Sequence, residues 1–331
     1  MRLVKAPGKD GAPATCSDNA RVNPNPAAPL AVTHYENFPV ASWLCPPQLR
    51  APIAAVYAFA RTADDLADEG PASAAERLEA LAAYRADLHA LAAGQAPSAR
   101  WPAVFLPLAG MLQRHGLPVP LLDDLLSAFI QDVEKTRDGA GYAQRAELLD
   151  YCRRSANPVG RLLLHLYGVH GAQALRESDA ICTALQLINF WQDLSVDLPR
   201  GRFYLPEADC AAHGVDRAQL QALQPTAQTT ALIGELAHWA RSTMQQGAPL
   251  VHRLPGRIGW ELRLVVQGGL RILDKVDALR GRSLCQRPRI RAWDAPGMLA
   301  RALAMQETFM GRNRGRSALK KSDKNGFSAL K

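Results

Sequence analysis

The chain has 331 residues, of which 48% are hydrophobic, 21% charged and 6% aromatic. This apolar fraction is too high for a disordered protein, and the length is sufficient to bury a large core. The longest uncharged apolar runs, such as 51–60 and 103–112, span about ten residues, whereas a membrane-spanning helix needs roughly 20. The sequence therefore predicts no membrane-spanning helix.

The formal net charge of +8 is concentrated at the C-terminus, where residues 311–331 contain seven basic side chains and one aspartate. Because no nucleic-acid motif accompanies this charge, a nucleic-acid partner is not expected. The tail is a candidate for peripheral contact with the inner membrane surface, and an inert extension is the alternative. The six cysteines form no CxxC pair and the N-terminus has no apolar signal segment, so we expect a cytoplasmic protein.

Three regions are expected along the chain: a disordered proline-rich extension over 1–33, an all-α domain over 34–309 and a basic disordered tail over 310–331. Alanine and leucine dominate the middle region, which favours helices, and no GxGxxG follows a strand. Ser73 and Glu76 form a capping-box pattern at a helix start. The predicted helices cover residues 36–44, 47–69, 73–94, 101–116, 119–134, 145–154, 157–169, 171–197, 227–247, 256–281 and 294–309.

A first polar stripe lies on the predicted helix 47–69. Tyr57, Arg61, Asp64 and Asp68 follow one another at helical spacing, with apolar residues on both sides. Carboxylates at this spacing share a helix face, and buried carboxylates need a partner such as Mg²⁺. An exposed acidic helix end explains this stripe equally well when it is considered alone.

A second polar stripe favours the metal-site interpretation over an exposed acidic helix end. Gln186, Asn189, Asp193 and Asp197 occur at almost the same spacing within an apolar helix that contains Phe190 and Trp191. Two such helices facing each other would bind two or three Mg²⁺ ions, which hold a diphosphate and help it leave. The many Leu, Ala and Val positions predict a large apolar ligand in a tunnel between the helices.

These residues resemble the squalene/phytoene synthases, and the resemblance extends from about Tyr35 to Arg289. Within that family the chain is most similar to the bacterial hydroxysqualene synthases of hopanoid biosynthesis. The supporting strings are Glu36-Asn-Phe-Pro-Val-Ala-Ser42, Ser155-Ala-Asn-Pro-Val-Gly160, Asn189-Phe-Trp-Gln-Asp193 and Leu254-Pro-Gly-Arg-Ile-Gly-Trp-Glu-Leu262. Most relatives carry arginine at the position of Gln192, so this chain lacks one cation that binds diphosphate. The resemblance implies an isoprenoid synthase fold, a single helical bundle around an apolar cavity.

The resemblance also implies the roles of individual residues. Asp64 and Asp68 match the metal ligands of the family's first motif, and Asn189, Asp193 and Asp197 match the metal site of its second. Tyr151 and Gln192 are implied as catalytic, and both are candidates, with Asn157, for positioning a water. Substrate or diphosphate contacts are implied for Asn37, Phe38, Tyr57, Arg61 and Gln186. The basic C-terminal ligand of the diphosphate is Arg282 or Arg287, with Arg282 preferred.

The implied reaction is the Mg²⁺-dependent ionisation of presqualene diphosphate, followed by rearrangement and capture by water to give hydroxysqualene. No NAD(P)H is expected. One alternative is a head-to-head transferase that makes presqualene diphosphate, squalene or phytoene from two prenyl diphosphates. The alternative from another class is a non-catalytic helical scaffold. Arg200 and Arg202 are either diphosphate contacts or solvated arginines.

Overall fold

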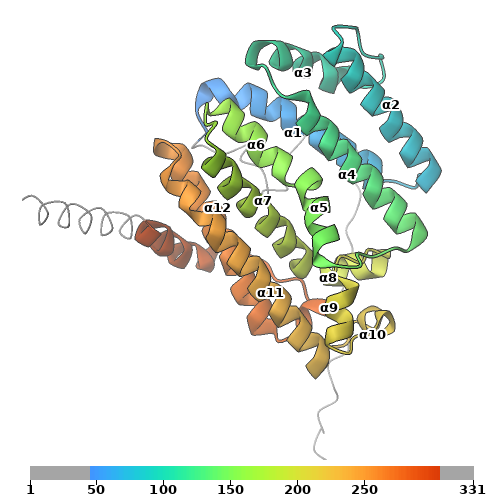
Figure 1. Ribbon diagram of the computed structural model, residues 1–331, viewed down its shortest axis with the longest axis vertical. Helices are drawn as coiled ribbons and strands as arrows, with labels where there is room; N and C mark the ends of the chain where they lie inside the picture. Colours follow the sequence, from blue (N-terminus) through green and yellow to red (C-terminus); the bar gives the residue numbers. More distant parts are fainter. Residues whose placement is uncertain (1–44, 306–331) are drawn as a thin grey trace, which may run out of the picture. The chain divides into compact units, whose positions relative to one another are not determined.

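The alanine- and leucine-rich body folds into α-helices, as its composition predicts (Figure 1). The computed structural model describes residues 45–305, all of which belong to the unit Tyr35–Lys331. Within 45–305 no strand forms, and the β-pairing is limited to an isolated bridge between Tyr142 and Pro206. The all-α prediction is therefore confirmed.

The helices follow the predicted boundaries closely. Ser73 forms the expected capping box with Glu76 at the start of its helix. The main helices are α1 (Pro47–Asp68), α2 (Ala74–Ala92), α3 (Pro102–His115), α4 (Val119–Asp138), α5 (Arg145–Ser155), α6 (Asn157–Leu166), α7 (Ala172–Gln192), α11 (Ala227–Gly247) and α12 (Gly256–Leu279). A further helical segment covers 295–305. The predicted helix 36–44 and the domain boundaries near 33 and 310 lie outside the described residues.

The predicted helix 171–197 is wrong in one respect, because it is broken at Asp193. This residue has φ −100° and ψ 12°, so α7 ends at Gln192 and a separate turn, α8 (Leu194–Asp197), follows. A 3₁₀ turn, η2 (Leu198–Arg200), then ends at Gly201, whose φ of 76° suits glycine. Two short helices, α9 (Glu207–Ala212) and α10 (Arg217–Gln221), were not predicted because they are too short to show a period.

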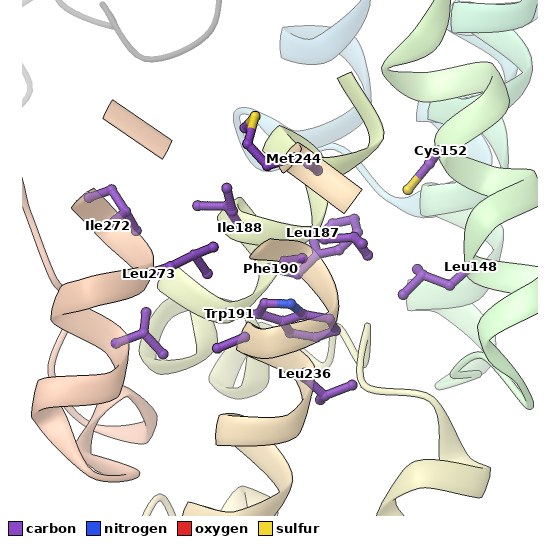
Figure 2. Packing of buried hydrophobic residues seen from close by; sticks show 14 of the residues in the cluster. Leu148, Cys152, Leu187, Ile188, Phe190, Trp191, Leu236, Met244, Ile272 and Leu273 are labelled. Atoms are coloured by element: carbon purple, nitrogen blue, oxygen red, sulfur yellow. The ribbon is translucent and has the colours of Figure 1, made fainter. Parts of the chain in front are cut away.

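Two apolar clusters hold these helices together. The first joins the four helices α1, α2, α3 and α4. Its centre contains Phe59, Tyr84 and Phe105, whose ring centroids lie 4.8–6.2 Å apart. The second surrounds α7, which packs against α6, α11 and α12. Figure 2 shows Phe190 and Trp191 inside this second cluster. Polar side chains on α7 are therefore placed in an apolar setting, where they need partners.

No helix among residues 45–305 is long and apolar enough to cross a membrane.

Candidate active site

The first acidic motif lies at the C-terminal end of α1. Arg61 contacts Asp64 at 3.0 Å and Asp65 at 2.7 Å, which are helical neighbours at three and four residues. Burial raises the pKa of Asp64, opposed by Arg61 and reinforced by Asp68. Asp64 is therefore a partly buried carboxylate with a nearby cation rather than a fully solvated group.

The second acidic motif spans the break between α7 and α8. Asn189 lies on α7, Asp193 is at the junction and Asp197 ends α8. Arg287 binds both carboxylate oxygens of Asp193, with Nη2 at 3.1 Å from Oδ2. Burial, reinforced by the neighbouring Asp193, raises the pKa of Asp197 to about 7. The motif thus contains one carboxylate paired with an arginine and one whose charged form is disfavoured by burial.

Two arginines after α8 connect the two motifs. Arg202 donates to Asp68 of α1, and Arg200 reaches the same carboxylate at 3.3 Å. Arg202 and Arg200 also lower the pKa of Asp197 through their charge. The two acidic motifs therefore face one region, as the paired stripes predict. A cavity of about 510 Å³ opens there, lined by Asp64, Ala67, Asp68, Ala74, Arg77, Phe129, Asp132, Val133, Thr136, Arg137, Arg200 and Arg202.

A third carboxylate, Asp132 of α4, lines the same cavity. Tyr151 donates its hydroxyl to one oxygen of Asp132 at 2.5 Å, and Tyr204 donates to the other at 3.2 Å. Burial raises the pKa of Asp132 to about 6, opposed by the Tyr151 hydrogen bond and by Arg202. The ring of Tyr204 stacks on Phe190 with centroids 4.0 Å apart. Asp132 is thus a hydrogen-bond acceptor held by two tyrosines, one of which stacks on Phe190.

The three side chains proposed to position water have different partners. Asn157 accepts a hydrogen bond from a threonine hydroxyl of α7 at 3.0 Å, inside the helix packing. Gln192 is buried and donates its amide to the Pro288 carbonyl at 2.9 Å. Tyr151 is the one that bonds to a cavity-lining carboxylate, Asp132.

The two candidates for the basic C-terminal ligand are also separated by the structure. Arg287 binds Asp193, and the neighbouring Pro288 is anchored by Gln192. Arg282 is exposed and donates to a backbone carbonyl at the end of α12, 3.3 Å away. The geometry therefore favours Arg287 over the preferred Arg282, because Arg287 reaches the second acidic motif.

The remaining predicted residues are placed as follows. Tyr57, Gln186 and Asn189 are half-buried on their helices. Tyr57 shares the face of α1 that contains the first acidic motif. Asn37 and Phe38 lie outside the described residues, so their predicted substrate contacts stay predictions.

The donor set fits a magnesium–diphosphate site better than a closed metal cage. Among residues 45–305, no three His, Cys, Asp or Glu side chains come together to hold a metal. Mg²⁺ is usually bound by one or two carboxylates, with substrate phosphates and water completing its shell. Asp64 with Asp68, and Asp193 with Asp197, are oxygen-donor pairs of that kind. Both pairs include a carboxylate whose pKa is raised, which a bound cation would relieve.

Sequence reasoning missed Asp132 and Tyr204 and left Arg202 undecided. Asp132 had a weaker signal than Asp64, because it is an aspartate near Ile130 and Val133 that has no second carboxylate one helical turn away. Tyr204 has no such signal, because it lies in an irregular segment whose path is set by tertiary packing.

A helical protein whose first acidic motif and arginines line one cavity, with a second acidic motif beside the same arginines, is suited to bind a diphosphate together with cations. The family model for squalene/phytoene synthase matches residues 31–294, and the chain belongs to this family. It is thus an enzyme that processes an isoprenoid diphosphate.

Known relatives support the same assignment. The chain is 37% identical over 247 residues to a hydroxysqualene synthase of Sinorhizobium fredii, covering 74% of this chain and 80% of that protein. It is 32% identical to a phytoene synthase of Thermus thermophilus, covering 84% and 89%. The crystal structure of squalene synthase HpnC from Alicyclobacillus acidocaldarius matches with a TM-score of 0.66 and 36% identity, covering 76% and 90%. The predicted isoprenoid synthase fold is therefore confirmed.

Proposed function

We propose that the chain is a hydroxysqualene synthase, which converts presqualene diphosphate and water into hydroxysqualene and diphosphate. The observation that supports it most directly is the convergence of Asp64, Asp68 and Asp197 with Arg202 on one region, with Arg287 at Asp193. Hydroxysqualene synthases are also among the relatives of highest identity, at 37% and 38% over more than two thirds of this chain.

The proposed chemistry divides between the two sides of the site. Asp64, Asp68, Asn189, Asp193 and Asp197 would hold Mg²⁺, which neutralises the diphosphate and helps it leave. The guanidinium groups of the site are suited to bind the same leaving group, because arginine recognises phosphate oxygens in a bidentate manner. The aromatic and apolar side of the site is suited to exclude bulk water while the carbocation rearranges with ring opening.

The product assay tests this function. Purified chain is incubated with Mg²⁺ and presqualene diphosphate without NADPH, and lipid and diphosphate are quantified. We expect a C30 alcohol and one diphosphate per alcohol, abolished by EDTA and restored by Mg²⁺. Asp68→Asn should reduce the rate by about a hundredfold or more, since it removes a ligand of the diphosphate-bound cations. Hydrocarbon without alcohol would contradict the proposal.

The head-to-head transferase is the second candidate, because the Thermus thermophilus phytoene synthase matches most of this chain. Gln192 weighs against it: this side chain is neutral and bonds to backbone, so one cation for a second diphosphate is missing. Consumption of farnesyl diphosphate with presqualene diphosphate untouched would establish the transferase instead. Folded protein that releases no diphosphate from either substrate would favour the scaffold alternative.

We further propose that the chain is cytoplasmic and that its basic tail contacts an anionic membrane, where substrate and product dissolve. Support comes from the concentration of positive charge over 311–331. Such contact should be seen as sedimentation with anionic but not neutral vesicles, and it should weaken at high salt. Equal binding to both vesicle types would leave the tail as an inert extension.

A further inference from the structure

The carboxylate of Asp132 has no part in the metal motifs, although it lines the same cavity. Asp64 and Asp68 come from α1, whereas Asp132 comes from α4. Its two oxygens accept hydrogen bonds from two tyrosines that belong to different segments, Tyr151 on α5 and Tyr204 after η2. A carboxylate fixed in this way on both oxygens has a defined orientation.

The two tyrosines favour an ionised Asp132 that can still accept further hydrogen bonds. Burial raises the pKa of both Tyr151 and Tyr204, so both remain protonated donors. Donation to a carboxylate favours its charged form. An ionised carboxylate has about four lone-pair sites, so two sites remain for other partners.

A small pocket beside Asp132 has the size of one water molecule. Its volume is about 10 Å³, and a single water needs about that much space together with two to four polar partners. Asp132, Lys135, Tyr142, Arg202 and Tyr204 are among the residues that line it. Since Asp132 also lines the main cavity, this pocket adjoins the region where the substrate would react.

We propose that Asp132, oriented by Tyr151 and Tyr204, holds the water that captures the carbocation and accepts its proton. This assignment rests on the proposed function. The ester C–O bond breaks and both electrons leave with diphosphate. After the cation has rearranged, a lone pair of the water oxygen forms the new C–O bond at a ring carbon, and the cyclopropane C–C bond at that carbon breaks. The electron pair of the broken ring bond forms the new C=C bond of hydroxysqualene, and one proton of the water passes to the Asp132 carboxylate. The products are hydroxysqualene, diphosphate and a protonated Asp132 that returns its proton to solvent.

The role of Asp132 is separable from ionisation, because it acts after diphosphate has left. The test compares Asp132→Asn with the wild-type chain, using presqualene diphosphate and Mg²⁺. Diphosphate release and the ratio of alcohol to C30 hydrocarbon are measured separately. We expect diphosphate release within about threefold of wild type and an alcohol-to-hydrocarbon ratio lowered about tenfold or more, since the base for water is lost. Asp132→Glu should restore part of that ratio.

Two further variants guard against a merely structural effect. Asp124→Asn removes a carboxylate from the same helix that interacts with Arg85 and Arg161 outside the cavity, and it should leave the product ratio unchanged. Tyr204→Phe keeps the carboxylate and removes one of its donors, so it should lower the ratio by about threefold. Circular dichroism confirms that each variant is folded.

The outcomes separate this role from the proposed function. If wild type makes alcohol and Asp132→Asn keeps the wild-type ratio, another group, such as the released diphosphate, accepts the proton and the role of Asp132 is refuted. If release and alcohol fall together by the same factor, Asp132 supports the fold and the role is also refuted. If wild type releases diphosphate and makes no alcohol, the proposed function fails and this role fails with it.

Discussion

Replacing one predicted metal ligand should stabilise the metal-free protein while it abolishes activity. Asp197 is half-buried, and burial, reinforced by the charge of Asp193, raises its pKa from 3.8 to about 7. A rise of about three units corresponds to about 4 kcal/mol against the ionised form. Partial exposure and solvent screening reduce this to about 1–2 kcal/mol. Asp197→Asn removes the penalty and keeps the shape of the side chain.

The sign of the effect fixes its pH dependence. Because the pKa of Asp197 is higher in the folded chain, the folded state binds this proton more tightly than the unfolded state. The penalty is absent below about pH 4 and grows as the pH rises to about 7, above which it is constant. The gain in stability from Asp197→Asn should therefore be largest at pH 8 and less than half as large at pH 5.

Thermal unfolding in EDTA measures this gain. For a domain of this size, about 1–2 kcal/mol corresponds to a rise in Tm of about 2–8 °C. Asp209→Asn is the matched control, because Asp209 is bound by Arg145 at 2.6–3.0 Å and is 13% exposed. That variant breaks an ion pair and should lower Tm. If Asp197→Asn lowers Tm at pH 8 as the control does, or raises it equally at both pH values, the reasoning is refuted.

Two further variant pairs test the site and the packing. Arg287→Met should lower kcat/KM by about a hundredfold because Arg287 reaches Asp193, whereas Arg282→Met should change it less than about threefold; equal losses would contradict the placement of Arg287. Gly247→Ala should lower the free energy of unfolding by about 1–3 kcal/mol, because its Cβ would lie 2.6 Å from a backbone oxygen of α7. Gly234→Ala on the same helix has open space and should stabilise by about 1 kcal/mol, as measured by denaturant unfolding.

Most helices were predictable because their signal is local. Apolar periodicity and caps such as Ser73 with Glu76 determine where a helix begins. The break at Asp193 was not predictable, since the apolar pattern continues through Leu194 and conceals a change of backbone direction. Asp193 nevertheless stays near Asp197, so the second stripe remains one acidic motif.

The choice between Arg282 and Arg287 could not be made from sequence, because both lie in a segment without a long helix that fixes their direction. The structure separates them through a long-range contact, the hydrogen bond from Gln192 to Pro288. This bond joins residues 96 positions apart and places Arg287 at the second acidic motif. Asp132 has no paired carboxylate on its helix, and the role proposed for it depends on tyrosines from two other segments.

In the proposed reaction, the charges at positions 192 and 132 act in the same direction on the captured water. A neutral Gln192 stands where the resemblance implies arginine in most relatives, and it bonds to the chain rather than to the cavity. Asp132 adds a carboxylate that accepts a hydrogen bond from Tyr204, whose ring stacks on Phe190. A water that attacks a carbocation becomes positively charged, so one cation fewer and one anion more both stabilise it. This charge arrangement is therefore consistent with the proposed hydration of presqualene diphosphate.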